Sequence, residues 1–198
     1  MRVLVFDHMN DCTPQNVQEM LSLVSPHRRQ QALQYKHTFG QFCCLKSWLM
    51  LKELLGHTPA EWHYNAAGKP FLTAEDSAIY FSISHCREAI AVAVADQPIG
   101  VDVESIRHVD HALIERTMNN HELQQIQTAH QPARAFTALW TQKEAWLKWQ
   151  GKGIESFEQL KGLWTEANET PSSVCTQTIE KDNYIYTITY GKLHCFGA

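Results

Sequence analysis

Two short segments of this chain carry acidic and basic side chains at spacings that suit metal and phosphate chemistry. In the first, IGVDVES, Asp102 and Glu104 alternate with Ile99, Val101 and Val103. If the segment is a strand, both carboxylates point to one face, about 7 Å apart, and the valines point into a core. Hard cations such as Mg²⁺ prefer oxygen ligands and keep several waters, so two or three carboxylates with a substrate phosphate can hold one. Taken alone, Asp-x-Glu is also common on an ordinary exposed strand.

The second segment, FTALWTQKEAWLKWQ, has apolar residues at helical spacing. Glu144 and Lys148 lie four residues apart on one face, with Lys143 beside them and Trp140 one turn earlier. A surface Glu–Lys pair stabilises a helix by only about 0.2–0.5 kcal/mol, and that role needs no tryptophan neighbours. Two acids on a strand, a third on a helix and lysines facing an anion together favour phosphoryl transfer.

These motifs resemble those of the 4′-phosphopantetheinyl transferases, specifically the single-chain, Sfp-like class. The family pattern Gly-[Ile/Val]-Asp-[Ile/Val]-Glu matches Gly100 to Glu104, and Trp-[Ser/Thr]-x-Lys-Glu-[Ala/Ser]-x-x-Lys matches Trp140 to Lys148 without a gap. Two upstream signatures also match, GKP at residues 68–70 and FSISH at residues 81–85. The resemblance extends over roughly residues 25–154.

The resemblance implies an activity and a partner. The family moves 4′-phosphopantetheine from coenzyme A to a serine of an apo carrier protein and releases adenosine 3′,5′-bisphosphate. The carrier would be an acyl, peptidyl or aryl carrier protein of fatty acid, polyketide or peptide synthesis. By the same resemblance, Asp102, Glu104 and Glu144 bind Mg²⁺, or Mn²⁺, on the diphosphate.

Catalytic roles follow from the same match. Glu144 is the candidate that activates the serine, directly or through water. Lys148 is expected to stabilise the diphosphate or the departing phosphate. Lys143 either helps at the diphosphate or has a structural or solvent-facing role.

Upstream residues are assigned to coenzyme A by the resemblance. His85 would donate to a diphosphate oxygen, and Ser84 would add backbone or hydroxyl contacts. Lys69 and Pro70 would form the loop beside the adenine and 3′-phosphate. Arg28 would hold the 3′-phosphate, because a guanidinium can bind phosphate through two parallel hydrogen bonds.

The match departs from the family pattern at this nucleotide end. Better-known members have a second lysine three residues after the Arg28 position and an arginine–threonine pair deeper in the helix. This chain has Gln31 and Cys43-Cys44 there, and Lys46 is a candidate substitute from the next turn.

Composition limits the classes of partner. The net charge of −4 argues against non-specific binding of nucleic acid. Residues 20–52 nevertheless contain no acid and five basic residues, which indicates a solvated helix face or a site for phosphate or an acidic carrier.

The remaining composition predicts a soluble chain. No apolar run reaches the roughly 18 residues that a membrane span needs, and the N-terminus predicts a first strand, not a secretory signal. We therefore expect a cytoplasmic chain, and the resemblance implies a monomer. The six cysteines include no Cys-x-x-Cys pair, so we expect reduced thiols.

The elements that must position these residues can be outlined from periodicity. A strand at the N-terminus precedes a helical stretch from Ser25 to Gly56, divided at Gly40. Three strand-length segments, AIYFSISH, AIAVAVAD and IGVDVESI, then predict an antiparallel meander. Helical patterns cover residues 111–117, 120–128 and 133–150, and the tail from residue 183 alternates as a strand does.

This order predicts an α+β fold with two similar halves that meet near Pro98. The resemblance implies two lobes, residues 1–98 and 99–198, related by a pseudo-twofold axis with the active site in the cleft between them.

Two other functions use the same residues. A Mg²⁺-dependent phosphohydrolase or nucleotidyltransferase could employ the three acids and two lysines with water or another acceptor. The GKP and FSISH signatures argue against it. A binding module could recognise an acidic carrier through the basic stretch without catalysis, but such a module has no need for Asp102, Glu104 and Glu144 together.

Overall fold

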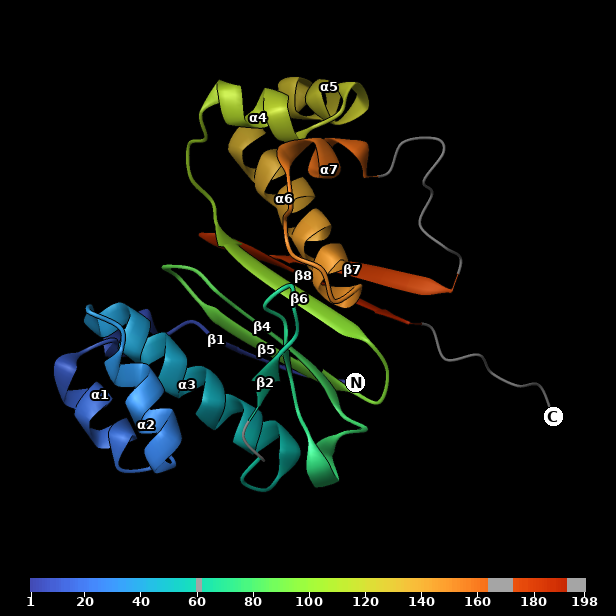
Figure 1. Cartoon of the computed structure of the whole chain (residues 1–198). Coiled ribbons are helices and arrows are strands. Elements are labelled where there is room, and N and C mark those ends of the chain that lie inside the picture. Colours follow the sequence, from blue (N-terminus) through green and yellow to red (C-terminus); the bar gives the residue numbers. More distant parts are fainter. Residues whose placement is uncertain (60–61, 164–172, 192–198) are drawn as a thin grey trace.

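The structure, a computed structural model, describes residues 1–59, 62–163 and 173–191 (Figure 1). Within these ranges the strands form two three-stranded sheets, with orders β1-β5-β4 and β6-β8-β7, and a separate pair, β2-β3. All of these pairings are antiparallel. Helices cover each of the two larger sheets, so the fold is mixed α+β, as the order of elements predicts.

The first sheet has β5 at its centre and a layer of three helices beside it. Its strands are β1 (Arg2–Phe6), β4 (Tyr80–His85) and β5 (Ile90–Ala95), and its helices are α1 (Pro14–Leu21), α2 (Pro26–Leu33) and α3 (Thr38–Leu55). Helix α3 packs on β1 and β5, and α1 and α2 pack on α3 (Figure 1). This first core is large, and its bulkiest fully buried side chain is Trp48.

The second sheet is covered by one long helix that lies across β6 and β8. Its strands are β6 (Ile99–Ser105), β7 (Val174–Glu180) and β8 (Tyr184–Gly191), and the long helix is α6 (Pro132–Trp149). Three shorter helices gather at the N-terminal half of α6, away from the sheet (Figure 1): α4 (His111–Thr117), α5 (Asn120–Thr128) and α7 (Phe157–Gly162).

The two halves meet where β4 packs beside β6. The backbone N–H of Val101 donates to Ser82 Oγ at 3.0 Å, which links the two strands. The β2-β3 pair (His63–Tyr64 and Pro70–Phe71) and two short 3₁₀ turns (Met9–Asp11 and Ala74–Asp76) complete the described elements.

Local sequence signals account for several boundaries. The Ser25 side chain accepts from the Arg28 N–H at the start of α2, and Gly56, with φ of 80°, ends α3. Asn119 and Glu122 form a capping box at α5. The predicted helices at residues 111–117 and 120–128 are confirmed, and the predicted 133–150 helix is shifted by one residue.

Three features of the fold differ from the predictions. The third strand of the predicted meander, β6, pairs with β8 and not with β5, so it begins the second sheet. The break in the long helical stretch lies between Leu33 and Thr38, and Gly40 is inside α3. Helices α1 and α7 and strand β7 were not predicted from their sequence. The predicted strand tail is described only as far as residue 191.

The expectations about membrane spans and about the cysteines can be compared with the described residues. No helix within them has the length and apolar character that a membrane crossing requires. The five described cysteines are free thiols, as predicted, and Cys195 lies outside the described residues.

Candidate active site

Strand β6 carries the two acids that the sequence places together. Val101 and Val103 are fully buried in the core between the sheets. Asp102, on the opposite face, is only 3% exposed, and Glu104 is half-buried. The predicted alternation along this strand is therefore confirmed, and the burial of Asp102 sets this strand apart from an ordinary exposed one.

Gly100 allows α6 to approach β6 closely. A Cβ atom at this position would lie 2.0 Å from the carbonyl oxygen of Ala145 and 2.4 Å from the backbone nitrogen of Trp149. Only a residue without a side chain permits this distance. The contact places Glu144 and Lys148, which neighbour these two residues on α6, next to the acids of β6.

Three side chains from three elements form a hydrogen-bonded network. Lys148 Nζ, from α6, lies 2.6 Å from Asp102 Oδ1 and 3.0 Å from Ser84 Oγ. Ser84, from β4, also donates from Oγ to Asp102 Oδ1 at 2.7 Å. Burial lowers the pKa of Lys148, but the carboxylates of Asp102 and Glu144 raise it. Their combined effect is larger than that of burial, so the pKa of Lys148 lies above its ordinary value. The ammonium is therefore charged at neutral pH.

The other two acids belong to the same electrostatic cluster. Burial and the charge of Asp102 raise the pKa of Glu104 to about 7. Burial and Asp102 also raise the pKa of Glu144, against the opposing effect of Lys148. Three carboxylates thus share the neighbourhood of one ammonium, and their mutual repulsion favours an added positive charge.

The cluster has a donor set that fits a divalent cation. Asp102 Oδ2 is buried and has no hydrogen-bond partner among the described residues. A buried carboxylate oxygen without a partner is costly unless a proton, a donor or a cation meets it. Across residues 1–59, 62–163 and 173–191, no three His, Cys, Asp or Glu side chains are already gathered as a metal-ligand group. The carboxylate oxygens are of the type that a divalent cation binds. The three side chains do not, however, already surround one point as metal ligands do.

A cavity of about 440 Å³ lies among α2, α3, the β2-β3 pair and β4. Its wall includes Arg28, Gln31, Cys44, Pro70 and His85. Arg28 is 1% exposed, and its guanidinium carbon lies 3.6 Å from the centre of the Trp62 ring and 4.5 Å from that of Trp48. These rings hold the guanidinium in place by cation–π contact.

His85 joins this cavity to the acid cluster, since it follows Ser84 on β4. Partial burial and the nearby Lys148 ammonium lower the pKa of His85, so its imidazole is neutral at pH 7 and can still donate one N–H. The ring also contacts Phe39 edge-on.

A second, smaller cavity of about 230 Å³ borders the other side of the cluster. Its polar wall comes from Glu104, Ser105, Arg107, His108, Asp110 and Thr137. Most of the surface that faces the cavity is nevertheless apolar, from Val109, Leu113, Phe136 and Trp140.

Lys69, which is predicted to lie beside the 3′-phosphate, does not line the cavity that contains Arg28. Its Nζ donates to the backbone carbonyls of Ile99 at 2.9 Å and Lys148 at 2.5 Å. Burial and the charge of Lys148 lower the pKa of Lys69 to about 8. Lys69 therefore ties its loop to the start of β6 and the end of α6, whereas Pro70 does line the larger cavity.

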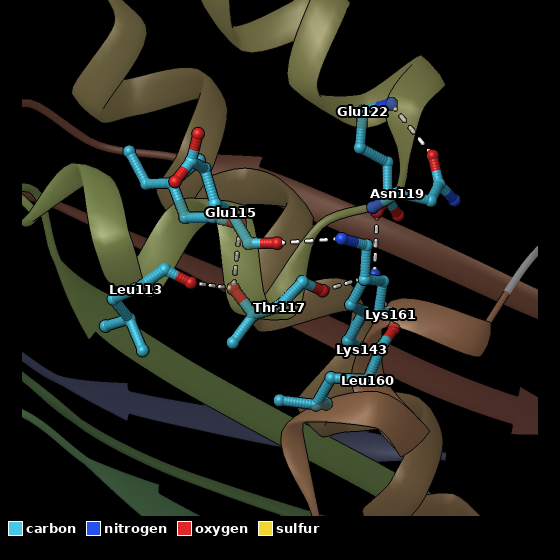
Figure 2. Close-up of polar contacts among 9 residues, drawn as sticks. Leu113, Glu115, Thr117, Asn119, Glu122, Lys143, Leu160 and Lys161 are labelled. Atoms are coloured by element: carbon cyan, nitrogen blue, oxygen red, sulfur yellow. Dashed lines mark hydrogen bonds and ion pairs between the residues drawn. The ribbon is translucent and has the colours of Figure 1, made fainter.

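Lys143 also differs, because its side chain points toward the ends of α4, α5 and α7 (Figure 2). It is fully buried, and Nζ donates to Glu122 and to the carbonyls of Thr117 and Leu160. Of the alternatives that the sequence left open, the structure places Lys143 in a structural position.

Within the stretch of residues 20–52, Lys46 lies outside the cavity that contains Arg28, and two of the large apolar side chains lie in the core. Lys46, the candidate substitute at the nucleotide end, lies 4.0 Å over the Phe6 ring and does not line the cavity of Arg28. Trp48 and Met50 are 1% and 4% exposed, so they belong to the core.

Several residues that shape the site were not singled out from the sequence. Ser82 links β4 to β6, Trp62 packs on Arg28, and Arg107 and His108 line the smaller cavity. Gly100 was noted only as part of a motif. Its place between apolar strand residues was the one available signal of a close backbone approach.

Comparison with known proteins gives consistent matches. The model of the 4′-phosphopantetheinyl transferase superfamily matches residues 98–195. The chain is 28% identical over 173 residues to the 4′-phosphopantetheinyl transferase gsp of Aneurinibacillus migulanus, covering 83% of this chain and 71% of that protein. It is 31% identical over 148 residues to AcpT of Salmonella typhimurium, a 4′-phosphopantetheinyl transferase, covering 67% and 77%. To psf-1 of Bacillus pumilus, which has the same designation, it is 38% identical over 89 residues, covering 44% and 38%.

Proposed function

The chain belongs to the 4′-phosphopantetheinyl transferase superfamily, a family of transferase enzymes, and from this we propose that it transfers 4′-phosphopantetheine from coenzyme A to a serine of an apo carrier protein. The observation that carries the proposal is the cluster of Asp102, Glu104, Glu144 and Lys148 next to the cavity that contains Arg28. An anion-binding cavity beside an acid cluster with one ammonium is what a diphosphate substrate requires.

Asp102, Glu104 and Glu144 would hold a divalent cation, Mg²⁺ or Mn²⁺. The partnerless Asp102 Oδ2 and the raised pKa values of both glutamates support this assignment. When bound, the cation would offset the negative charge of the diphosphate. Carboxylate oxygens are the ligands that these hard cations prefer.

The transfer step uses Glu144 and Lys148. Glu144 accepts the proton of the carrier serine, and its raised pKa favours this general-base role. The serine oxygen forms a bond to the phosphorus that carries the pantetheine group, and the bond from that phosphorus to the bridging oxygen breaks. The electron pair remains on the bridging oxygen, which leaves as part of adenosine 3′,5′-bisphosphate. Lys148, released in part from Asp102, stabilises this developing charge.

The larger cavity would receive the nucleotide half of coenzyme A. Arg28 is held by Trp48 and Trp62 at its wall and would bind the 3′-phosphate. His85 would donate to a diphosphate oxygen, with Ser84 beside it and Pro70 near the adenine. The ammonium groups of Lys69 and Lys143 bind backbone carbonyls and Glu122, so the proposal gives neither residue a role in binding coenzyme A.

The smaller cavity supports transfer to a carrier over simple hydrolysis. Its largely apolar lining next to Glu104 suits the uncharged pantetheine arm or an approaching carrier better than water. A phosphohydrolase needs no such surface.

We further propose that residues 1–98 and 99–198 form two lobes related by a pseudo-twofold axis, and that the chain acts as a monomer. In support, each half contains a three-stranded antiparallel sheet packed on one long helix. The candidate site draws Ser84 and His85 from the first half and its acids from the second.

The proposal is tested by mixing the purified chain with coenzyme A, Mg²⁺ and acyl, peptidyl and aryl apo carriers. Intact-mass spectrometry should show one added phosphopantetheine on at least one carrier, together with release of adenosine 3′,5′-bisphosphate. A carrier with alanine at the acceptor serine is the matched control. No gain in mass on any carrier, or nucleotide release without a carrier, would contradict the proposal.

A further inference from the structure

Lys143 binds three separate helices through one ammonium group (Figure 2). Nζ lies 3.1 Å from the carbonyl oxygen of Thr117, 2.7 Å from Glu122 Oε2 and 2.6 Å from the carbonyl oxygen of Leu160. The side chain is completely buried. The transfer step described above does not use this ammonium, although it sits one residue before Glu144.

The three partners lie at helix ends. Thr117 is the last residue of α4, Leu160 is in the last turn of α7, and Glu122 is in the first turn of α5. The last carbonyls of a helix lack partners within the helix and carry partial negative charge. A lysine ammonium has three donors, and here two of them meet such C-terminal carbonyls and the third meets the Glu122 carboxylate.

Glu122 is itself fixed by a second contact. Its Oε2 accepts from the backbone N–H of Asn119 at 2.7 Å, which completes the capping box of α5. The carboxylate thus cannot follow a displaced ammonium without breaking that cap. Lys143 is therefore attached to a group that the start of α5 holds rigidly.

The position of Lys143 on α6 connects this contact to the active site. Successive side chains on a helix point about 100° apart, so an anchored Lys143 fixes the direction of Glu144. Lys148 lies on the same face as Glu144, one turn further on. A rotation of α6 about its axis would move both side chains relative to Asp102 on β6.

We propose that Lys143 is a positioning residue: its bonds to the ends of α4, α5 and α7 fix the rotation of α6 and so direct Glu144 and Lys148 at the acids of β6. The inference rests on the proposed function for the roles of Glu144 and Lys148. It adds that α4, α5 and α7, which together form a helical cap on the second half, help to set the catalytic geometry.

The test replaces the buried pair by apolar residues, Lys143→Met with Glu122→Leu. Removal of both charges avoids leaving one of them buried and unpaired, so the double variant should fold. We expect kcat for carrier modification to fall about tenfold or more, with KM for coenzyme A changed less than about twofold, because small misplacements of a catalytic group reduce kcat strongly. A stably folded double variant with kcat close to that of the wild type would overturn the proposal.

Lys161→Met is the matched control. Lys161 Nζ donates to the Glu115 carbonyl at 3.0 Å and links the same helices, α7 and α4, but this bond is exposed and joins no residue of α6 (Figure 2). This variant should keep the wild-type kcat. An equal loss in both variants would show that general loosening of the cap, and not the bonds of Lys143, affects the rate.

A second variant covers the case in which the double variant does not fold. Glu122→Gln keeps an oxygen acceptor for Lys143 and leaves both carbonyl bonds in place. Its kcat should stay within about threefold of the wild type, and a loss of about tenfold or more would contradict a role based on the bonds of the ammonium.

A further readout separates this inference from the proposed function. If the wild-type chain modifies no carrier, the proposed function fails, and the positioning role is read from Mn²⁺ binding by calorimetry. A misdirected Glu144 should weaken Mn²⁺ binding of the double variant about fivefold or more, and unchanged binding would overturn the inference.

Discussion

Lys148 Nζ lies 2.6 Å from Asp102 Oδ1, so an ammonium from α6 and a carboxylate from β6 form an ion pair across the contact between helix and sheet. Asp102 is almost completely buried, and the Lys148 side chain is 26% exposed. Ser84 contributes from β4, in the other half of the chain. The candidate site therefore exists only where three elements distant in sequence have come together.

Replacement of this lysine should affect both stability and rate. Lys148→Met leaves Asp102 buried without its cation, which should lower the free energy of unfolding by about 2–4 kcal/mol. Loss of a charge positioned at the leaving group should also lower kcat by about 100-fold or more. Urea denaturation and intact-mass kinetics measure the two effects. Lys152→Met, at an exposed position on the following turn, is the control and should change neither.

Glu144→Gln tests the general base with little change in shape. The amide occupies nearly the same volume but cannot accept the serine proton, so kcat should fall about 100-fold or more. The melting temperature should stay near that of the wild type. Glu155→Gln, at an exposed position, should retain full activity. Undiminished carrier modification by Glu144→Gln would exclude Glu144 from catalysis.

Gly100→Ala tests the close packing of α6 on β6. The added methyl group would meet backbone atoms of Ala145 and Trp149 at 2.0 and 2.4 Å, and backbone cannot move aside locally. We expect a loss of about 3 kcal/mol in the free energy of unfolding and little remaining activity. Gly162→Ala is the control, because its Cβ would meet no described atom within 4 Å. Equal stability of the two variants would contradict the close approach of α6.

The pH dependence of stability tests the environment of Glu104. Its pKa is raised from 4.5 to about 7 by burial and by Asp102, so between these pH values the folded chain keeps a proton that the unfolded chain has lost. The contribution of this group to stability is present below pH 4.5 and is lost as pH rises through about 7. With allowance for solvent screening, we expect about 1–2 kcal/mol. Denaturation in EDTA from pH 5 to 8 measures it, and Glu104→Gln should remove this part of the slope.

The sequence was sufficient for the acidic end of the site. A two-residue alternation in β6 and a four-residue repeat in α6 place Asp102, Glu104, Glu144 and Lys148 on defined faces, and local geometry is enough to predict this. Helix caps such as Ser25 and Asn119 likewise depend only on neighbouring residues. The predicted alternation along β6 and the predicted cap at Ser25 were confirmed, whereas the cap at Asn119 was not predicted.

The lysines show why the remainder could not be predicted. Lys69 and Lys143 occupy motif positions that suggest phosphate contacts, yet each bonds to backbone carbonyls of elements distant in the chain. A lysine side chain is long enough to reach several partners, and only the tertiary fold decides among them. The pairing of β6 with β8 was missed for the same reason, because strand periodicity does not specify which strand is the partner.

The position of a bound cation would show whether Asp102, Glu104 and Glu144 together hold a metal ion on the diphosphate. Crystals of the chain grown with coenzyme A and Mn²⁺ would be measured for anomalous scattering from manganese. We expect one manganese peak within about 2.5 Å of carboxylate oxygens from Asp102, Glu104 and Glu144, in contact with the diphosphate. A diphosphate bound with its manganese at other residues, or no manganese at these three acids, would contradict this expectation.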